Sequence, residues 1–401
     1  MKKQFLLVVA AATLSASLWA QSTDDYTNPI ITAMPSLTIA PDATAAGMGD
    51  IGVATRPDMN SQHWNAAKYA FIDERGGITA SYTPWLRSLV GDIDLAYLAG
   101  FYRFDELQAV SAGFTYFSMG KVDLIDNTGN MFQEAHPNEW ALDVAYSRKL
   151  HEYVSMAATL RFLYSDLNNG ANSSVANGSI ELYPAWTMAA DISLYYRQPI
   201  ELPFGTSYLA VGTNISNLGG KMTYDKGDHQ NFIPANWRTG VSYELPFDNY
   251  NRLTANLEAN KMLVPASKYS KFAPKDENGN QITTGNTYSE WFSDLSSASG
   301  WFQSFADAPR GFKEEMDEIQ WGMGLEYSYD RKFFGRLGYS HEARYKGNRR
   351  YFTLGAGFKL SIVRLDISYC VATNSSNPLN NTMRFTLGFD LYGIKDLVNN
   401  R

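Results

Sequence analysis

The chain has 401 residues and a formal net charge of −7, from 34 Lys and Arg against 41 Asp and Glu. This balance argues against nucleic acid as a partner, because nucleic-acid binding depends on clustered Lys and Arg. The one cysteine, Cys370, has no second cysteine to pair with, which excludes an intramolecular disulfide.

Residues 1–20 have the pattern of a secretory signal peptide. Two lysines follow Met1, an apolar stretch runs from Phe5 to Leu14, and small residues lead to Ala20. The apolar stretch is too short to cross a membrane as a helix. We therefore expect this leader to be removed after Ala20, and we exclude it from the fold.

Residues 21–75 show no alternation of apolar and polar side chains. Pro35, Pro41 and several glycines predict a compact, irregular segment with one short helix. The run from Gly47 to Gly52 spells G-x-G-x-x-G, but a dinucleotide site also needs a preceding strand and a following helix. Neither is visible, so we interpret these glycines as positions of close backbone approach and expect no cofactor.

From Gly76 onward one unit repeats, with about ten residues of alternating apolar and polar or small side chains followed by a loop. Residues 321–329 and 383–391 show the alternation most clearly. Successive side chains of a strand point to opposite faces, so each segment has one apolar face. The fourteen predicted strands are 76–83, 92–104, 107–118, 138–149, 152–166, 184–197, 206–217, 236–246, 250–262, 319–330, 332–343, 350–361, 362–373 and 381–391.

The connections between these strands are alternately short and long. A soluble sandwich does not need this difference, whereas an outer-membrane barrel has short periplasmic turns and long extracellular loops. The sequence therefore predicts an all-β fold, a 14-stranded antiparallel transmembrane β-barrel over residues 76–392, in the bacterial outer membrane with its long loops extracellular. Both chain ends would then be periplasmic, with residues 393–401 as a periplasmic tail.

A barrel of fourteen strands has a lumen too wide for its own side chains to fill. We expect residues 21–75 to enter that lumen and plug it, which would also satisfy inward-facing polar groups. A disordered periplasmic leader is the alternative.

The longest connection, residues 263–318, is the candidate binding loop, because loops of this length are usually functional or disordered. Asn278-Gly279 predicts a hairpin turn; the region resembles a calcium loop superficially, but the expected Glu is replaced by Thr287. Downstream, aromatic and apolar residues recur at helical spacing and form either a lid or a docking surface for a partner. These candidate partner-binding residues are Trp291, Phe292, Leu295, Trp301, Phe302 and Phe305.

Neither a metal site nor a catalytic site is expected. The five histidines show no i, i+4 pair and no cysteine pair accompanies them, so we predict no bound metal. Ser340-His341-Glu342 lies at the outer end of a predicted strand, where a lipid deacylase could act. Adjacent strand residues face opposite sides, however, so Ser340 and His341 cannot meet, and we predict no enzyme.

Three stretches of the N-terminal segment resemble the PorV family of type IX secretion barrels: PSLTIAPDA at 35–43, GMGDIGVAT at 47–55 and WNAAK at 64–68. That family is similar to the FadL-like transporters, which have fourteen strands and a lumen plug. The wider group has Asn-Pro-Ala where this chain has Asn65-Ala66-Ala67, and without the proline this turn is less rigid. The motif residues that carry the resemblance are Pro41, Asp42, Gly47, Gly49, Gly52, Trp64 and Asn65.

The resemblance implies a non-enzymatic shuttle in the outer membrane. Its partners would be the C-terminal signal domains of cargo, the translocon barrel, a sortase-like surface protease with its attachment-complex proteins, and outer-membrane lipopolysaccharide. Two alternatives stay open. One is a FadL-like importer of hydrophobic molecules, for which Pro184 is the nearest candidate for a wall kink. The other is a lipopolysaccharide deacylase.

Overall fold

The computed structural model describes residues 27–87, 90–125, 131–169, 182–225, 229–266, 269–282, 285–373 and 379–393. The predicted signal peptide and residues 394–401 of the predicted tail lie outside the described residues. Among the helices that are described, none combines the length and the apolar character needed to cross a membrane.

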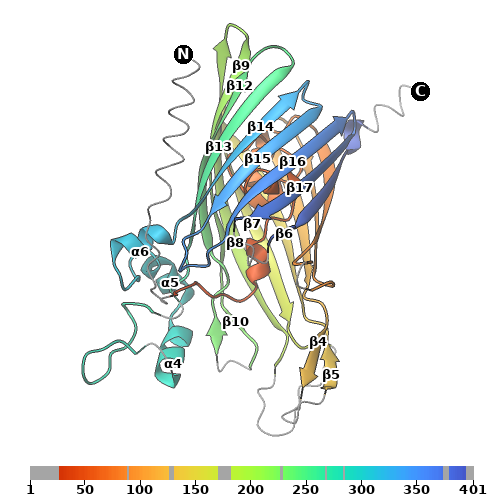
Figure 1. The fold of residues 1–401 in the computed structure, drawn as a ribbon. Coiled ribbons are helices and arrows are strands. Elements are labelled where there is room, and N and C mark those ends of the chain that lie inside the picture. Colours follow the sequence, from red (N-terminus) through yellow and green to blue (C-terminus); the bar gives the residue numbers. More distant parts are fainter. Residues whose placement is uncertain are drawn as a thin grey trace, which may run out of the picture.

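Fourteen antiparallel strands form one closed barrel, in which each strand pairs with its two neighbours and β1 pairs with β18 (Figure 1). The fold class predicted from the alternation is confirmed. The barrel strands are β1 Gly76–Pro84, β2 Asp94–Arg103, β3 Gln108–Ser118, β6 Asn138–His151, β7 Val154–Asp166, β8 Ala185–Leu202, β9 Gly205–Gly219, β12 Asn236–Pro246, β13 Asn251–Met262, β14 Gln320–Tyr329, β15 Phe333–His341, β16 Arg350–Leu360, β17 Val363–Ala372 and β18 Met383–Asp390.

The strands alternate between an exposed apolar face and a buried face. On β18, Phe385 and Leu387 point outward and are exposed, whereas Arg384 and Thr386 between them are buried. The same pattern puts Met323 and Leu325 of β14 on the outside. An apolar exterior with a polar interior is the arrangement that a lipid-embedded barrel needs.

The two ends of the barrel differ in the length of their connections. One end has only short turns, such as the one between β8 and β9, and we call it the short-turn end. The other end, the long-loop end, has small hairpins and helices that extend the barrel (Figure 1). They are β4 Val122–Ile125 with β5 Met131–Ala135, β10 Met222–Thr223 with β11 Gln230–Asn231, and helices α4 Asn286–Asp294, α5 Ser297–Gln303 and α6 Phe312–Asp317.

The segment before the barrel forms four short helical turns where one helix was expected. They are η2 Pro35–Thr38, α2 Ala43–Ala46, α3 Ser61–Trp64 and η3 Ala66–Phe71. Local sequence explains two of the starts, because Pro35 occupies the first turn of η2 and the Asp42 side chain accepts a hydrogen bond from the Ala45 amide. We call residues 27–41 the strap and residues 42–72 the lumen segment.

The chain enters the barrel from the long-loop end. The Asn28 amide donates to the carbonyl of Tyr345, in the connection between β15 and β16, and the Ala33 amide donates to Phe232 beside β11. Strand β1 then starts at the opposite, short-turn end, where β18 also finishes. The expectation that both chain ends share one side of the barrel is therefore wrong for Thr27, the first described residue. Sequence reasoning missed this because the contacts that join the strap to the barrel and its loops connect residues more than 100 positions apart.

Candidate functional site at the long-loop end

The lumen segment is hydrogen-bonded to strands on one side of the barrel through its backbone amides. The Ala43 amide donates to Thr386 Oγ1 of β18 at 2.9 Å, and the Gly49 amide donates to Thr353 Oγ1 of β16 at 2.9 Å. The Glu258 carboxylate of β13 accepts from the amides of Gly52 and Val53, at 2.8 and 2.9 Å. Inward side chains of the barrel thus satisfy backbone groups that water cannot reach.

The later part of the same segment is bonded to the opposite strands. Gln62 Nε2 donates to Asp143 of β6 at 2.5 Å, and Asn214 Nδ2 of β9 donates to the carbonyl of Trp64 at 3.0 Å. Ser155 Oγ of β7 donates to the carbonyl of Ala67 at 2.7 Å. Since its partners surround it, the lumen segment lies inside the barrel (Figure 1).

The structure brings the predicted motif residues together. Trp64 is only 2% exposed, and its Nε1 donates to Asp42 Oδ2 at 2.7 Å. Asn65 accepts from the Ala67 amide at 3.1 Å and donates to the carbonyls of Val53 and Leu194, each at 3.0 Å. Pro41 is buried next to Asp42. These hydrogen bonds of Asn65 hold the turn at residues 65–67, where the wider group has a proline and this chain has Ala66.

The glycines of the motif are places of close packing, as predicted. Gly49 has a φ of +85° and lies against the backbone of Tyr339, while Gly47 faces Gly355 of β16. Gly52 lies under the ring of Trp64, where a Cβ would overlap the indole. On the barrel side, a Cβ at Gly338 of β15 would overlap the backbone of Met48 and Gly49. Glycine at both surfaces lets the segment and the wall touch.

Charged side chains that face the lumen are paired with one another. Arg161 of β7 lies 3.0 Å from Asp191 of β8. Arg336 of β15 and Arg364 of β17 each lie 2.7 Å from the Asp366 carboxylate. Such pairs neutralise charges that burial would otherwise make costly.

Of the cavities beside the lumen segment, two lie toward opposite ends of the barrel. The cavity toward the long-loop end has a volume of about 80 Å³ and is lined by Asp50, Arg238 and Tyr351 among others. The one toward the short-turn end measures about 270 Å³ and is lined by Arg56, Asp58 and other residues. Residues of the lumen segment line both cavities.

The loop between β13 and β14, residues 263–319 without 267–268 and 283–284, is the cap loop. Its helix α4 is attached to the loop between β9 and β12. The ring of Phe292 packs edge-on against Phe232, with centroids 5.1 Å apart. Lys221 Nζ lies 4.1 Å from the Phe232 ring centre and donates to the carbonyls of Phe292 and Ser293, each at 2.9 Å. Burial lowers the pKa of Lys221 to about 8.

The six candidate partner-binding residues divide into two groups. Trp291, Phe292, Leu295 and Trp301 are half-buried within the cap loop, whereas Phe302 and Phe305 are 77% and 45% exposed. Phe305 lies 6.2 Å from Trp237 of β12, at the rim of the barrel. Only Phe302 and Phe305 of the six are exposed.

Sequence reasoning missed two further exposed apolar residues. Phe312 and Met316 lie on α6 and are 79% and 48% exposed. The acidic run 314–318 begins inside α6 and ends just after it. The i, i+4 spacing of Phe312 and Met316 was the available signal for this helix.

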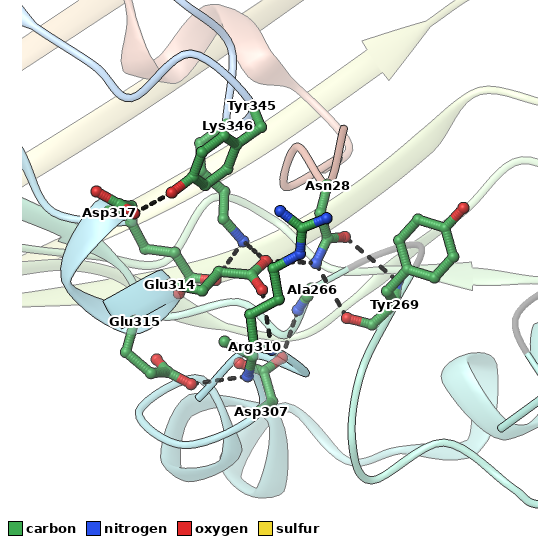
Figure 2. Close-up of polar contacts among 12 residues, drawn as sticks. Asn28, Ala266, Tyr269, Asp307, Arg310, Glu314, Glu315, Asp317, Tyr345 and Lys346 are labelled. Carbon is green, nitrogen blue, oxygen red and sulfur yellow. Dashed lines mark hydrogen bonds and ion pairs between the residues drawn. The ribbon is translucent and has the colours of Figure 1, made fainter. Parts of the chain in front are cut away.

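A buried cluster of acidic and basic side chains fixes the cap loop to the barrel (Figure 2). Lys346 Nζ lies 2.7 Å from Glu314 and 2.8 Å from Glu318. Lys261 is the residue before the end of strand β13. Its Nζ lies 2.7 Å from a carboxylate oxygen of Glu318 and 3.4 Å from one of Glu315. The two lysines come from two separate rim segments, so α6 is held on both sides.

Asn28 of the strap completes this cluster and is fully buried (Figure 2). Its Nδ2 donates to the carbonyl of Tyr269 at 3.0 Å and to Glu314 Oε1 at 3.1 Å, and its Oδ1 accepts from the Tyr269 amide at 3.2 Å. With the bond from its own amide to Tyr345, Asn28 connects the strap to two long loops.

The three residues of Ser340-His341-Glu342 have different surroundings. His341 stacks on Trp321 with ring centroids 4.9 Å apart, and its Nδ1 lies 3.1 Å from the Tyr339 hydroxyl. Glu342 is bound by Arg349 at 2.8 Å. Ser340 instead lines the cavity toward the long-loop end. The interpretation that the serine and histidine face opposite sides agrees with this geometry.

Comparison with known proteins gives one family and a set of barrels of similar fold. The family model described as "Type IX secretion system protein PorV" matches residues 21–269. No relative among curated proteins matches the chain in sequence.

Two solved structures illustrate the shared fold. The Ralstonia pickettii toluene transporter TbuX is 10% identical, with a TM-score of 0.50 over 87% of this chain and 97% of that one. The P. putida toluene transporter TodX is 9% identical, with a TM-score of 0.51 over the same shares of the two chains. At these identities the likeness concerns the fold alone.

Proposed function

Because this chain belongs to the PorV family of type IX secretion system proteins, we propose that it is a non-enzymatic shuttle for secreted cargo. Family membership gives the coarse role, an outer-membrane β-barrel of the type IX system. The finer steps are the proposal: the protein binds the C-terminal signal domain of cargo at the translocon barrel. It then delivers the cargo to a sortase-like surface protease and the attachment complex, which link it to lipopolysaccharide.

The observation that carries this proposal is the occupied lumen. Residues 42–72 are bonded to strands on opposite sides of the barrel and pack backbone against backbone at Gly338 and Gly355. We propose that the segment plugs the lumen. A barrel closed in this way acts through its surfaces, not through a channel.

The long-loop end supplies a surface suited to a protein partner, which we propose is extracellular. Phe302, Phe305, Phe312 and Met316 are exposed on a loop whose buried ion pairs hold it in place. Exposed aromatic side chains on a rigid support are the residues that dominate binding energy at interfaces. The rigid support matters because little ordering entropy is then lost on binding.

The test is a pull-down in mild detergent from outer membranes, followed by mass spectrometry. The variant carries Phe302→Ala with Phe305→Ala, and the control carries Ile31→Ala, an exposed apolar residue of the strap. We expect the control to recover as much cargo as the wild type. The amount of cargo recovered with the double variant should be lower by a factor of about ten or more. Equal recovery by all three proteins would contradict the shuttle.

A FadL-like transporter is the second candidate, favoured by the barrel fold shared with the toluene transporters. Uptake of a labelled hydrophobic compound into liposomes that contain the wild-type protein separates the two functions. A shuttle with a plugged lumen gives no uptake above empty liposomes. Uptake that saturates with substrate would support the transporter instead.

A further inference from the structure

Three carboxylate side chains of the cap loop lie close enough to share one cation. They are Asp307, which follows α5, Glu315 of α6, and Glu318 just after α6. One oxygen from each lies within 4.8 Å of the others, and all three residues are buried. Figure 2 shows Asp307 and Glu315 beside the Asn28 and Lys346 contacts described above.

Asp307 provides a separate indication that a ligand belongs here. Its side chain is 0% exposed, and its Oδ2 accepts from the Ala266 amide at 2.5 Å. Its Oδ1 is buried and has no hydrogen-bond partner among the described residues. A buried carboxylate oxygen without a partner is costly unless a proton or a cation binds it.

The surrounding lysines do not balance the carboxylates. Lys261 serves both Glu315 and Glu318, and Lys346 is shared between Glu318 and Glu314. Within the residues that the structure describes, neither lysine forms an ion pair with Asp307. In the described part of the loop, the ion pairs of both lysines are therefore made with Glu314, Glu315 and Glu318, not with Asp307.

We propose that Asp307, Glu315 and Glu318 bind one divalent cation of the calcium type. Oxygen-only ligands with more than one carboxylate suit Ca²⁺, which accepts irregular geometry. The ion would join the turn after α5 to α6 and strengthen the seat of the cap loop on the rim. Histidine and cysteine spacing indicates zinc sites, and the loop pattern around Asn278 concerns one contiguous calcium loop, so neither signal addresses three carboxylates brought together by the fold. This inference does not depend on the shuttle function.

The competing explanation is a proton on Asp307. Burial, with the nearby charges of Glu318 and Glu315, raises the pKa of Asp307 to about 7. An asparagine in its place resembles the protonated acid in shape and charge. Asp307→Asn therefore keeps the protonated arrangement but removes an anionic ligand from the cation.

The experiment uses the full-length protein in detergent, first treated with EDTA and then titrated with CaCl₂ or TbCl₃. Ala266 connects Tyr288 to the proposed site: its carbonyl accepts from the Tyr288 hydroxyl at 3.2 Å, and its amide donates to Asp307. The Tyr288 ring can therefore sensitise Tb³⁺ luminescence. We expect one ion per chain with a Kd for Ca²⁺ of about 10⁻⁴ to 10⁻³ M, the range of extracellular modules. CaCl₂ should also raise the thermal midpoint.

Asp307→Asn and Glu315→Gln should each weaken binding by about tenfold or more, because each removes one charged ligand. The matched control is Glu290→Gln, an exposed acid on α4 of the same loop, which should bind as the wild type does. Heat-resistant migration in detergent gels shows whether each variant is folded. If one of the two ligand variants fails to fold, the other still tests the site. Absence of a wild-type response up to 10 mM CaCl₂ (about ten times the upper Kd), or equal binding by all four proteins, would overturn the proposal.

Discussion

The lumen segment and the cap loop are both irregular parts of the chain held by the same barrel, but they are held in different ways. The lumen segment packs through glycines and small side chains, and its backbone is hydrogen-bonded to the wall on opposite sides. The cap loop is held at a few points by buried ion pairs, by Asn28 and by Lys221. Its aromatic side chains are left partly exposed.

This difference separates support from recognition. Contacts spread over a backbone hold the lumen segment at many points, which suits a structural role. A loop fixed at a few points can present varied side chains between them without disturbing the barrel. Substitutions should therefore lose stability in one region and binding in the other, and five predictions test that division.

The largest effect is expected where wall and lumen segment touch. In Gly338→Ala, the new Cβ would overlap the backbone of Met48 and Gly49, which cannot move aside easily. We expect a loss of about 3 kcal/mol in the free energy of unfolding, at the upper end for overpacked sites. The temperature at which the folded barrel unfolds in detergent gels measures it. The control is Gly335→Ala on the same strand, where a Cβ would meet nothing within 4 Å. Equal stability of the two variants would contradict close packing in the lumen.

Asn28→Ala tests the connection between the two regions. The change removes three hydrogen bonds between the strap and the residues at Tyr269 and Glu314. We expect a local loss of about 2 to 3 kcal/mol, because the site is buried and charge-assisted. Amide hydrogen exchange in residues 269–282 and 342–349 should quicken, while β12 and β13 stay protected. Ile31→Ala, on the same strap but 64% exposed, is the control and should leave exchange unchanged.

Lys221→Met addresses one attachment point of the cap loop. The ammonium group binds the last carbonyls of α4, where the negative end of the helix dipole favours a cation. Its removal should cost about 1 to 2 kcal/mol in the local stability of α4, measured by exchange of the α4 amides. Lys275→Met, at an exposed position of the same loop, should have no such effect.

Lys221 should also make the local stability of α4 depend on pH. Since burial lowers the pKa of Lys221 to about 8, below that of an unfolded lysine, the unfolded loop binds more protons between pH 8 and 10. Protection of α4 should therefore rise with pH in this window in the wild type. Lys221→Met should remove that rise, and an equal rise in the variant would assign it to another group.

The smallest effect on stability is expected on α6. Phe312→Ala with Met316→Ala removes exposed apolar groups, so the free energy of unfolding should change by less than about 0.5 kcal/mol. If α6 belongs to the partner surface, cargo recovery in the pull-down should fall together with that of the Phe302 and Phe305 variant. Unchanged recovery would limit recognition to the part of the loop around α5.

The barrel could be predicted from the sequence because its signal is strictly local. A side-chain period of two residues and alternating loop lengths determine strand number and position, and the predicted strand at 350–361 matches β16, Arg350–Leu360. Cys370 falls in the predicted strand 362–373 and lies in β17, Val363–Ala372. Each of these inferences used residues within about ten positions of one another.

The strap and the ion-pair cluster could not be predicted, because their partners are distant in sequence. Asn28 and Glu314 are separated by 286 positions, and nothing in either local pattern indicates the other. The pairing of Asp42 with Trp64 was accessible only as a shared motif, not as a contact. Exposure of the aromatic residues was equally hidden, since helical spacing alone does not say that Phe292 packs on Phe232 while Phe302 does not.

The route of the chain from the long-loop end to the short-turn end has a consequence for biogenesis. The pairing of β1 with β18, from Gly77 opposite Asp390 to Tyr82 opposite Phe385, closes the cylinder around residues that precede β1. If β1 and β18 paired first, the residues that precede β1 would have to thread into a barrel that is already closed. We therefore expect β1 and β18 to pair late in folding, after the other strands have begun to assemble around the residues that precede β1.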